Sequence, residues 1–323
     1  MSKSKGNVIA PQKIVDTYGA DILRLWTAST DYSAELTISD EILKRVVESY
    51  RRIRNTLRFL LANLADFDIQ HQALPLDQWL SIDRHAMVML AEFQHEVLAH
   101  YERYEFHQIV QKLHHFCSED LGGFYLDILK DRLYTMPVDS VARRSAQNAL
   151  YHITHSLTRL MAPFLSFTAE EVWQQLSQDE HDSVFLQCWH EIPTPAAPHV
   201  LAEQWRLIRE TLTELRKHLE TLRSAGEIGS SLQAEVEIHA DAAHYAALAA
   251  LGDDLRYAMI TSGAELHLAN GAAPRISARA SSHSKCERCW HYRADVGKHA
   301  DHPGLCSRCH GNLYTPEERR THV

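Results

Sequence analysis

The sequence predicts a mainly α protein, in which a long helical bundle is followed by a small α/β unit and a short cysteine-rich element. Apolar residues recur at steps of three or four through most of the first 190 residues, which is the spacing of one face of an amphipathic helix. A segment of alternating apolar and polar residues begins at Ala234, and two CxxC pairs lie between Cys286 and Cys309. We therefore expect helices first, then a unit that contains strands, then an element held together by its cysteines.

Two hydroxyls and two lysines open the chain at Ser2, Lys3, Ser4 and Lys5, and Gly6 follows them. Lysine ammonium groups neutralise oxyanions, serine hydroxyls donate hydrogen bonds to phosphate oxygens, and glycine lets the backbone approach closely. This combination is typical of a loop that binds a polyphosphate. It also occurs in ordinary charged N-terminal turns, so these residues alone leave both interpretations open.

A helix is expected around Asp21 to Thr27, and a longer one after Ser39 or Asp40, either of which can cap its N-terminus. The apolar face of the long helix comprises Ile42, Val46, Tyr50, Ile53, Leu57, Leu60 and Leu64. Its basic residues fall mainly on the opposite face and comprise Lys44, Arg45, Arg51, Arg52 and Arg58. Such a face is either a solvated surface of a bundle helix or a surface that follows the phosphates of an RNA.

Further helices are expected as far as residue 192. Apolar stripes predict helices over 86–104, 106–116 and 140–162. The pair Gly122-Gly123 interrupts the pattern, and Thr168 and Glu171 have the spacing of a capping box at the start of the next helix. Together these segments predict a helical bundle.

Residues 191–200 contain three prolines and are the best linker candidate in the chain, so we place a domain boundary there. The helix expected next carries several basic residues, including Arg216. Beyond it, Ala234, Val236 and Ile238 alternate with glutamates, as in a half-buried strand. The expected order is a helix over 201–224, a strand from 234, a helix over 241–252 and one or two strands within 256–268.

The pairs Cys286/Cys289 and Cys306/Cys309 are separated by sixteen residues. Each pair can present two thiolates on a tight turn, and two pairs complete a tetrahedral shell around zinc with no open position. A redox disulfide is less consistent with two pairs, because redox CxxC motifs usually stand singly at a helix start, whereas a rubredoxin-type iron site uses similar spacing. We predict a zinc ribbon in which these four cysteines bind one structural zinc ion.

Other side chains of the ribbon could take part in binding. Its histidines at 283, 291, 299, 302 and 310 could replace a cysteine, but four thiolates already satisfy the ion, so most of them are expected at the surface. Arg288, Arg308, Trp290 and Tyr292 could contact RNA by charge and stacking. For Trp290 the alternative, which we favour slightly, is that it forms the ribbon's own small core.

Length, composition and charge limit the class of protein. With 323 residues, 45% of them hydrophobic, the chain can form two or three domains with a sizeable core. No apolar run reaches the roughly 18 residues that span a membrane, and the start shows no signal-peptide core, so we expect a cytoplasmic protein with no membrane partner. The net charge of −9 disfavours a nucleic-acid partner. However, bases concentrate in residues 1–26, 40–64, 200–223 and 275–323, which is compatible with basic patches on an acidic body.

Three stretches of the chain carry a resemblance to a known family. The string MSKSKGNVIAPQ, then YGADILRLW, then ISDEILKRVVESYRRIRNTLRFLLANLADFD closely resembles bacterial-type isoleucyl-tRNA synthetases, beginning inside their KMSKS signature. In class I synthetases this signature is a mobile loop whose second lysine stabilises the ATP triphosphate while the aminoacyl-adenylate forms. The resemblance implies this catalytic role for Lys3. It also implies contacts of Ser2, Lys3 and Ser4 with the phosphates of ATP, which acts with magnesium as a substrate of the complete enzyme.

The resemblance covers nearly the whole chain and implies a role for each part. It implies that residues 1–38 end the catalytic domain with the KMSKS loop and stem-contact region, and that 39–192 form an anticodon-binding helical bundle. It further implies an α/β junction domain over 200–272 and the zinc ribbon over 280–323. The implied partner is the isoleucine acceptor tRNA, and its candidate contacts are Lys44, Arg51, Arg52, Arg58, Arg216 and Trp290.

The implied function is that of an isoleucine–tRNA ligase, which attaches isoleucine to its tRNA at the expense of ATP. Because the chain begins inside the KMSKS signature, we expect a C-terminal portion of such an enzyme, monomeric and unable to form the adenylate alone. Two alternatives remain, namely a fragment of a valyl- or leucyl-type synthetase, which shares the MSKS loop, and a non-catalytic zinc-dependent RNA-binding protein. The segments ISDEIL and YRRIRNTLRFLLANL and the cysteine ribbon favour an isoleucyl enzyme over these alternatives.

Overall fold

The computed structural model describes residues 4, 8–33, 35–177, 179, 181–269, 274–315 and 318–323. The chain divides into two compact units. The first comprises Met1–Ile69, Met89–Gly123 and Leu150–Pro193, and the second comprises Gln70–Val88, Phe124–Ala149 and Thr194–Val323. Within the described residues, no helix combines the length and the apolar character that crossing a membrane requires.

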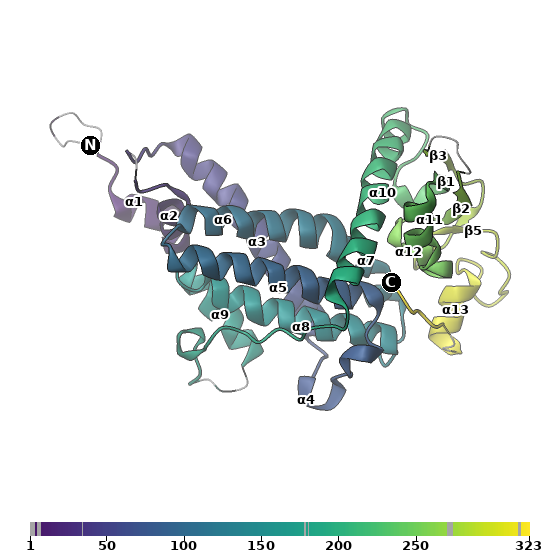
Figure 1. Cartoon of the computed structure of the whole chain (residues 1–323), viewed down its shortest axis with the longest axis horizontal. Helices are drawn as coiled ribbons and strands as arrows, with labels where there is room; N and C mark the ends of the chain where they lie inside the picture. Colours follow the sequence, from purple (N-terminus) through teal and green to yellow (C-terminus); the bar gives the residue numbers. More distant parts are fainter. Residues whose placement is uncertain are drawn as a thin grey trace. The chain divides into compact units, whose positions relative to one another are not determined.

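The first unit is built from helices, which confirms the predicted mainly α class. They are α1 (Pro11–Tyr18), α2 (Ala20–Ser29), α3 (Asp40–Leu64), α6 (Phe106–His115), α9 (Ser166–Leu176) and parts of α5 (Ser81–Glu102) and α8 (Val141–Met161), with a short 3₁₀ turn, η4 (Val184–Leu186). Helix α3 packs against α6 and α9, and α2 packs against all three (Figure 1). The apolar face of α3 is buried at Val46, Ile53, Leu57 and Leu60, so the predicted stripe is the face that packs.

The two caps expected in this unit have different outcomes. Ser39 caps α3 as predicted, because its Oγ accepts a hydrogen bond from the Ile42 amide at 3.2 Å. The prediction of a capping box that begins at Thr168 is wrong, since α9 already begins at Ser166. The Thr168 hydroxyl instead donates to Asp21 Oδ2 at 2.5 Å, and Glu171 forms an ion pair with Arg54 at 2.8 Å. Partners on α2 and α3 take up both side chains that the local motif would have used.

The glycine pair after α6 lies in a π-helical segment, η3 (Phe116–Tyr125), rather than in a break between helices. A Cβ atom at Gly122 would lie 3.0 Å from the Cys117 carbonyl oxygen, so the close approach of the backbone needs a residue without a side chain. The chain therefore continues from α6 through this wider turn into α7 (Leu126–Thr135).

The second unit combines helices with two small sheets. Besides parts of α5 and α8 it contains α7, α10 (Pro198–Ser224), β1 (Ala234–Ala240), α11 (Ala242–Ala249), α12 (Leu255–Ala258), β2 (Gly263–Leu268), β3 (Arg275–Ala280), β4 (Ser284–Lys285), β5 (Tyr292–Arg293) and α13 (Ser307–Tyr314). Shorter turns are α4 (Ile69–Gln72), η2 (Leu76–Gln78), η5 (Ser231–Gln233) and η6 (Gly252–Asp254). The predicted strand at 234 is confirmed as β1, whereas β3 was not expected from the sequence.

The larger sheet has the order β2-β1-β3, with β1 parallel to β2 and antiparallel to β3. Along β1, Val236 and Ile238 are buried, and helices α10 and α11 contact the sheet. The alternate residues Glu235, Glu237 and His239 are only half-buried and lie on the opposite, open face.

A buried ionic cluster fixes α7 within the second unit. Asp83 accepts hydrogen bonds from Arg132 Nη2 and from the Tyr125 hydroxyl, both at 2.7 Å, and from Ser145. All four side chains are almost completely buried. Burial, together with the neighbouring Asp83 carboxylate, raises the pKa of Tyr125 well above its ordinary value, so this phenol stays a hydrogen-bond donor. The position of α7 matters for the metal centre described next.

Candidate metal centre and basic surfaces

The four cysteines of the ribbon come together in one buried cluster. Cys286, Cys289, Cys306 and Cys309 are each at most 7% exposed, and their sulfur atoms all lie within 4.8 Å of one another. The sulfur atoms of Cys289 and Cys306 are 3.8 Å apart. In a tetrahedron with zinc–sulfur bonds of about 2.3 Å, sulfur atoms lie about 3.8 Å apart. None of the described cysteines forms a disulfide, so the cluster has the composition and spacing of a four-thiolate zinc site.

Local backbone geometry explains how the two CxxC pairs form this cluster. In the first pair, the Cys286 amide donates to the His291 carbonyl at 2.8 Å, and Trp290 turns the chain with a positive φ of 65°. In the second pair, Cys306 precedes α13 and its sulfur accepts from the Cys309 amide at 3.5 Å. Amide groups thus point at the sulfur atoms, which stabilises thiolates. Partly buried Val296 and Leu305 pack against the cluster, so there is little apolar core to fold the element without an ion.

One carboxylate on α7 holds the ribbon and the C-terminal segment in place. Asp131 accepts two hydrogen bonds from Arg308 and one from Arg320, each at 2.7 Å, and we call these three residues the Asp131 clamp. Burial alone would raise the pKa of Asp131, but the attraction and hydrogen bonds of Arg308, with the charge of Arg320, outweigh it and lower the pKa below its ordinary value. Asp131 therefore remains charged above about pH 4.

The C-terminal segment is anchored by further contacts within the second unit. Asp254 Oδ2 accepts from the amides of Thr321, His322 and Val323 at 3.1, 2.9 and 3.3 Å. The Arg320 guanidinium lies over the Tyr257 ring, 3.2 Å from its centroid. Sequence analysis missed these anchors, because residues 254 and 321 approach one another only in the folded chain.

A basic groove lies between α3 and α6 in the first unit. Its volume is about 700 Å³, and it is lined by Lys44, Arg45, Arg52 and His114 together with Glu41 and Glu48. Partial burial, followed by the charge of Arg52, lowers the pKa of His114. Of the predicted contacts, Lys44 and Arg52 share this groove. His114 was missed because no local pattern shows that α6 packs beside α3.

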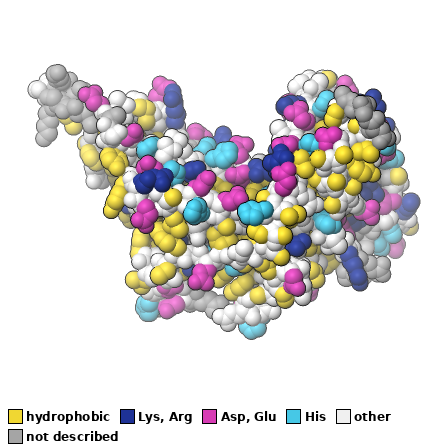
Figure 2. Space-filling view, viewed as in Figure 1, with side chains coloured by type: hydrophobic (Ala, Val, Ile, Leu, Met, Phe, Trp, Pro, Cys, Tyr) yellow, Lys and Arg dark blue, Asp and Glu magenta, His cyan; other side chains and the backbone are white. Residues whose placement is uncertain are grey.

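The other candidate contacts are also at the surface. Arg51 and Arg58 are exposed on α3, and Arg51 pairs with Glu48 at 2.8 Å. In the second unit, Arg216 lines an open pocket on α10 and lies 4.0 Å from Asp127. Figure 2 shows lysines and arginines interspersed with acidic residues on the face seen, rather than gathered into a single patch.

The predicted phosphate-binding loop lies largely outside the residues that the structure describes. Ser2 and Lys3 lie outside the described residues, and Ser4 is exposed. Their contacts with ATP therefore stay a prediction.

Comparisons with known proteins agree with these features. Three family models match the chain: "Anticodon-binding domain of tRNA ligase" over residues 83–238, "tRNA synthetases class I (I, L, M and V)" over 1–39, and "Zinc finger found in FPG and IleRS" over 284–310. An isoleucine–tRNA ligase from Thiobacillus denitrificans is 62% identical over 323 residues, which is 100% of this chain and 34% of that protein. One from Nitrosomonas europaea is 62% identical over 99% of this chain and 35% of that protein. Along its whole length the chain is closely similar to proteins named isoleucine–tRNA ligase.

The chain spans about a third of the length of the curated isoleucine–tRNA ligases that it matches, and it corresponds to their C-terminal part. The match to the zinc-finger model covers all four cysteines, and these cysteines form the buried cluster. The predicted zinc ribbon with one structural zinc ion is confirmed. A zinc ion bound by these four thiolates would hold the two CxxC turns together and have no open position for catalysis.

Several residues around the zinc site differ from expectation. Trp290 is 59% exposed, so the interpretation that it forms the ribbon's small core is wrong, because the cysteines with Val296 and Leu305 fill that interior. The Lys285 ammonium lies 5.0 Å from the centroid of its ring. Arg308 is occupied by the Asp131 clamp instead of facing solvent.

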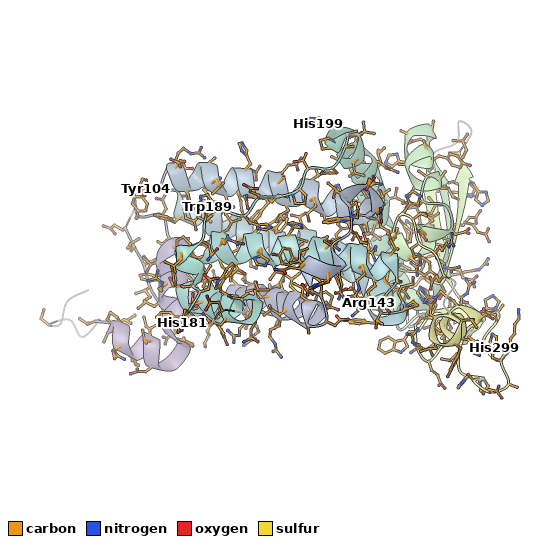
Figure 3. All side chains as sticks on the ribbon, turned by 90° about the horizontal axis from the view of Figure 1, so that it is seen from below. Tyr104, Arg143, His181, Trp189, His199 and His299 are labelled. Atoms are coloured by element: carbon orange, nitrogen blue, oxygen red, sulfur yellow. The ribbon has the colours of Figure 1, made fainter. Side chains whose placement is uncertain are left out.

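The histidines of the ribbon divide into two groups. His291 is buried, with Nδ1 3.7 Å from Asp131 Oδ1, although most of these histidines were expected at the surface. His299 lies in the ribbon (Figure 3) and stacks on His310, with ring centroids 3.8 Å apart. None of these three histidines belongs to the four-cysteine cluster.

Proposed function

We propose that this chain is the tRNA-binding C-terminal portion of an isoleucine–tRNA ligase, which in complete form attaches isoleucine to its tRNA at the expense of ATP. The observation that carries the proposal is the 62% identity to an isoleucine–tRNA ligase along the entire chain. The valyl, leucyl and non-catalytic alternatives are not favoured, because the two relatives described above are both named isoleucine–tRNA ligase, and the zinc-finger model, described as found in FPG and IleRS, agrees with that name.

The basic groove between α3 and α6 supports a tRNA-binding role for the first unit. Lys44 and Arg52 line it, and Arg51 and Arg58 extend the exposed basic surface along α3. Cations spaced along one helix face can neutralise successive phosphates of an RNA backbone and release counterions. We propose that this surface follows the tRNA backbone, which positions the RNA without reading its sequence.

Two residues of the second unit are proposed as additional contacts. The exposed ring of Trp290 offers a face on which an unpaired base can stack, and the neighbouring Lys285 can attract phosphate. Arg216 on α10 adds a further positive charge.

Catalysis in the complete enzyme is proposed to use Lys3 on the triphosphate of ATP, with Ser2 and Ser4 as hydrogen-bond donors and magnesium as the counter-charge. The 323-residue chain alone is proposed to form no isoleucyl-adenylate. A lysine can neutralise phosphate charge, but it does not orient ATP and a carboxylate for in-line attack, and that positioning is a large share of the catalysis. The described residues contain a three-stranded and a two-stranded sheet, neither of which is a large nucleotide-binding sheet. Isoleucine-dependent exchange of pyrophosphate into ATP by the purified chain would refute this point.

The chain is further proposed to act as a monomer in the cytoplasm. A reducing compartment suits the described cysteines, none of which forms a disulfide. Light scattering during size-exclusion chromatography tests the proposed monomer.

Binding measurements on charge variants test the proposed tRNA surface. Lys44→Ala combined with Arg52→Ala is expected to weaken binding of isoleucine tRNA and to lower the slope of log affinity against log salt by roughly one for each phosphate that is no longer neutralised. Lys130→Ala is the control, because Lys130 pairs with Asp127 at 2.8 Å on α7, outside this groove. Equal affinities and slopes for the double variant, the control and the unaltered chain would contradict this surface.

A further inference from the structure

Three potential metal ligands converge on the open face of the larger sheet. Glu237 and His239 are two positions apart on β1, so their side chains share that face. His267 on β2 is paired with His239 in the parallel register. One ligand atom from each of the three side chains lies within 4.8 Å of the others.

The distances within this group lie on either side of those in a metal site. His239 Nε2 is 2.7 Å and His267 Nε2 is 3.6 Å from the same oxygen of Glu237. Nitrogen and oxygen ligands at about 2.0–2.1 Å from a tetrahedral ion lie roughly 3.4 Å apart. Small rotations of the three side chains would therefore form the shell. Glu265 adds a second carboxylate, 3.9 Å from His267 Nε2.

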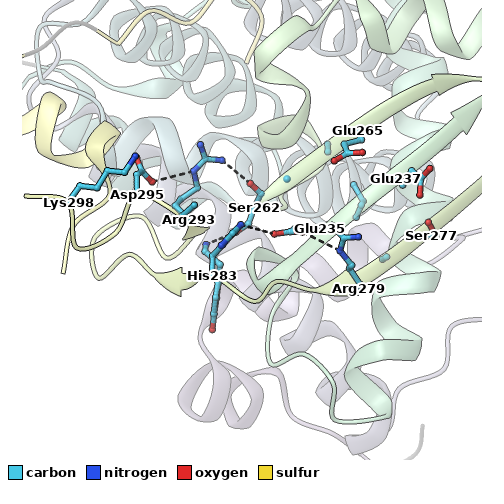
Figure 4. A pocket seen from close by; sticks show the side chains of 16 residues that line it. Glu235, Glu237, Ser262, Glu265, Ser277, Arg279, His283, Arg293, Asp295 and Lys298 are labelled. Carbon is cyan, nitrogen blue, oxygen red and sulfur yellow. Dashed lines mark hydrogen bonds and ion pairs between the residues drawn. The ribbon is translucent and has the colours of Figure 1, made fainter. Parts of the chain in front are cut away.

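The group is accessible from solvent. The side chains of His239, Glu237 and His267 are 23%, 45% and 45% exposed, so an ion can enter and keep water on its open side. Glu237 and Glu265 line one end of a cavity of about 720 Å³ between the sheet and the ribbon (Figure 4).

We propose that Glu237, His239 and His267 bind a divalent transition-metal cation, of which zinc is the chosen probe, at a site distinct from the four cysteines. Two imidazoles and a carboxylate are ligands for borderline cations such as zinc, nickel and copper, whereas calcium and magnesium prefer all-oxygen shells. Three protein ligands leave a position for water, unlike the closed four-thiolate site. The inference is independent of the proposed function, because it rests on the geometry of this face.

Arg275 allows the proposed site to be distinguished from a hydrogen-bonded cluster. Its Nη2 lies 3.3 Å from His239 Nε2, where it competes with a metal for the imidazole nitrogen and repels a cation. Arg275→Gln is therefore expected to tighten metal binding. If these side chains only form hydrogen bonds with one another and bind no metal, Arg275→Gln would remove a hydrogen bond and would not change the binding of metal.

Calorimetric titration with zinc tests the proposal on the full chain, after elemental analysis has shown one zinc per chain in the ribbon. A second equivalent is expected to bind the unaltered protein. It is expected to be lost in His239→Gln, His267→Gln and Glu237→Gln. His267→Gln is the decisive variant, because His267 is half-exposed on edge strand β2 and its replacement leaves the core intact.

His244→Gln is the matched control. His244 also lies between two carboxylates, 2.9 Å from Asp241 and 3.4 Å from Glu210, but it is not part of any convergent group found among the described residues. The control should keep the second equivalent. No binding beyond the ribbon zinc, or the same loss in His244→Gln as in His267→Gln, would overturn the proposal.

Discussion

The carboxylate of Asp83 is fully buried and is satisfied by Arg132, Tyr125 and Ser145. Asp83→Ala would leave the Arg132 charge buried without its partner, so we expect the free energy of unfolding to fall by about 3–5 kcal/mol. Denaturant melts measure this. Asp127→Ala is the control, since that carboxylate is partly exposed, and a loss as small as the control's would show that the cluster is not important for stability.

A cluster of histidines makes the stability of the first unit sensitive to acid. His155 is 8% exposed, and its ring lies 5.4 Å from that of His190 and 4.2 Å from that of Tyr151. Burial, followed by the charge of Arg159, lowers the pKa of His155 to about 3. Burial, with the neighbouring His152 and Arg159, likewise lowers the pKa of His190 to about 3.

Stability should therefore fall as the pH drops below about 6.5, because there the unfolded chain binds protons that the folded unit does not. Above that pH these histidines contribute no pH dependence. His155→Gln should reduce the loss between pH 6.5 and pH 5 by up to about 1.4 kcal/mol per pH unit, measured by denaturant melts at each pH. His95→Gln is the control, because it removes an exposed histidine of α5 that is not part of this cluster. An unchanged slope in His155→Gln would contradict the assignment.

Single residues were predictable where their partners are near in sequence. Ser39 caps its own helix, and each CxxC pair folds on a local turn. The contacts of Thr168 and Arg308 were not predictable from the sequence. Thr168 bonds to Asp21, which is 147 residues away, and Arg308 bonds to Asp131, which is 177 residues away.

At the scale of elements, the ribbon is expected to fold only with its zinc ion. Val296 and Leu305 give it little apolar core, so the metal supplies the folding energy. Chelation or Cys286→Ser should expose residues 284–314 to protease while the far-ultraviolet circular dichroism of the helices changes little. The variant should also weaken use of tRNA more than it disturbs the bundle. A folded ribbon in protein that contains neither zinc nor iron would contradict this.

The Asp131 clamp is expected to hold the ribbon against α7. Asp131→Asn removes the carboxylate that accepts three hydrogen bonds from two buried arginines, which keep Glu318 as a second partner, so we expect a lower free energy of unfolding. We expect zinc to pass faster to a colorimetric chelator, because the ribbon opens more often. Asp127→Asn, four residues earlier on the same helix, should release zinc at the unaltered rate, and equal rates in both variants would show that the clamp does not restrain the ribbon.

Helices and strands were predictable from the sequence where their apolar residues repeat at regular spacing. The long helices α3, α5, α8 and α10 have strong apolar stripes, and strand β1 alternates cleanly. Strand β3 escaped prediction although its residues alternate, because two of its three half-buried residues are alanines, which make the apolar side of the alternation weak. The π-helical turn at Gly122 was interpreted as a break, because glycine pairs usually mark one.

At the scale of the whole molecule, the resemblance to isoleucyl-tRNA synthetases predicted the family, the zinc site and the mainly α class. Physical patterns alone would have left the basic face of α3 indistinguishable from a solvated surface, since Arg45, Arg51 and Arg54 of this helix each pair with a glutamate. The predicted boundaries at 38, 192 and 272 stay a prediction. The identity of the RNA is likewise a matter for binding experiments.

Competition between tRNAs tests the central claim most directly. The purified chain should bind isoleucine tRNA more tightly than an isoleucine tRNA whose anticodon nucleotides have been exchanged, measured by fluorescence anisotropy at moderate salt. Both affinities should fall steeply as salt increases, because phosphate contacts release counterions, while the difference between them persists. Indistinguishable affinities for the two tRNAs at every salt concentration would contradict anticodon recognition by this chain.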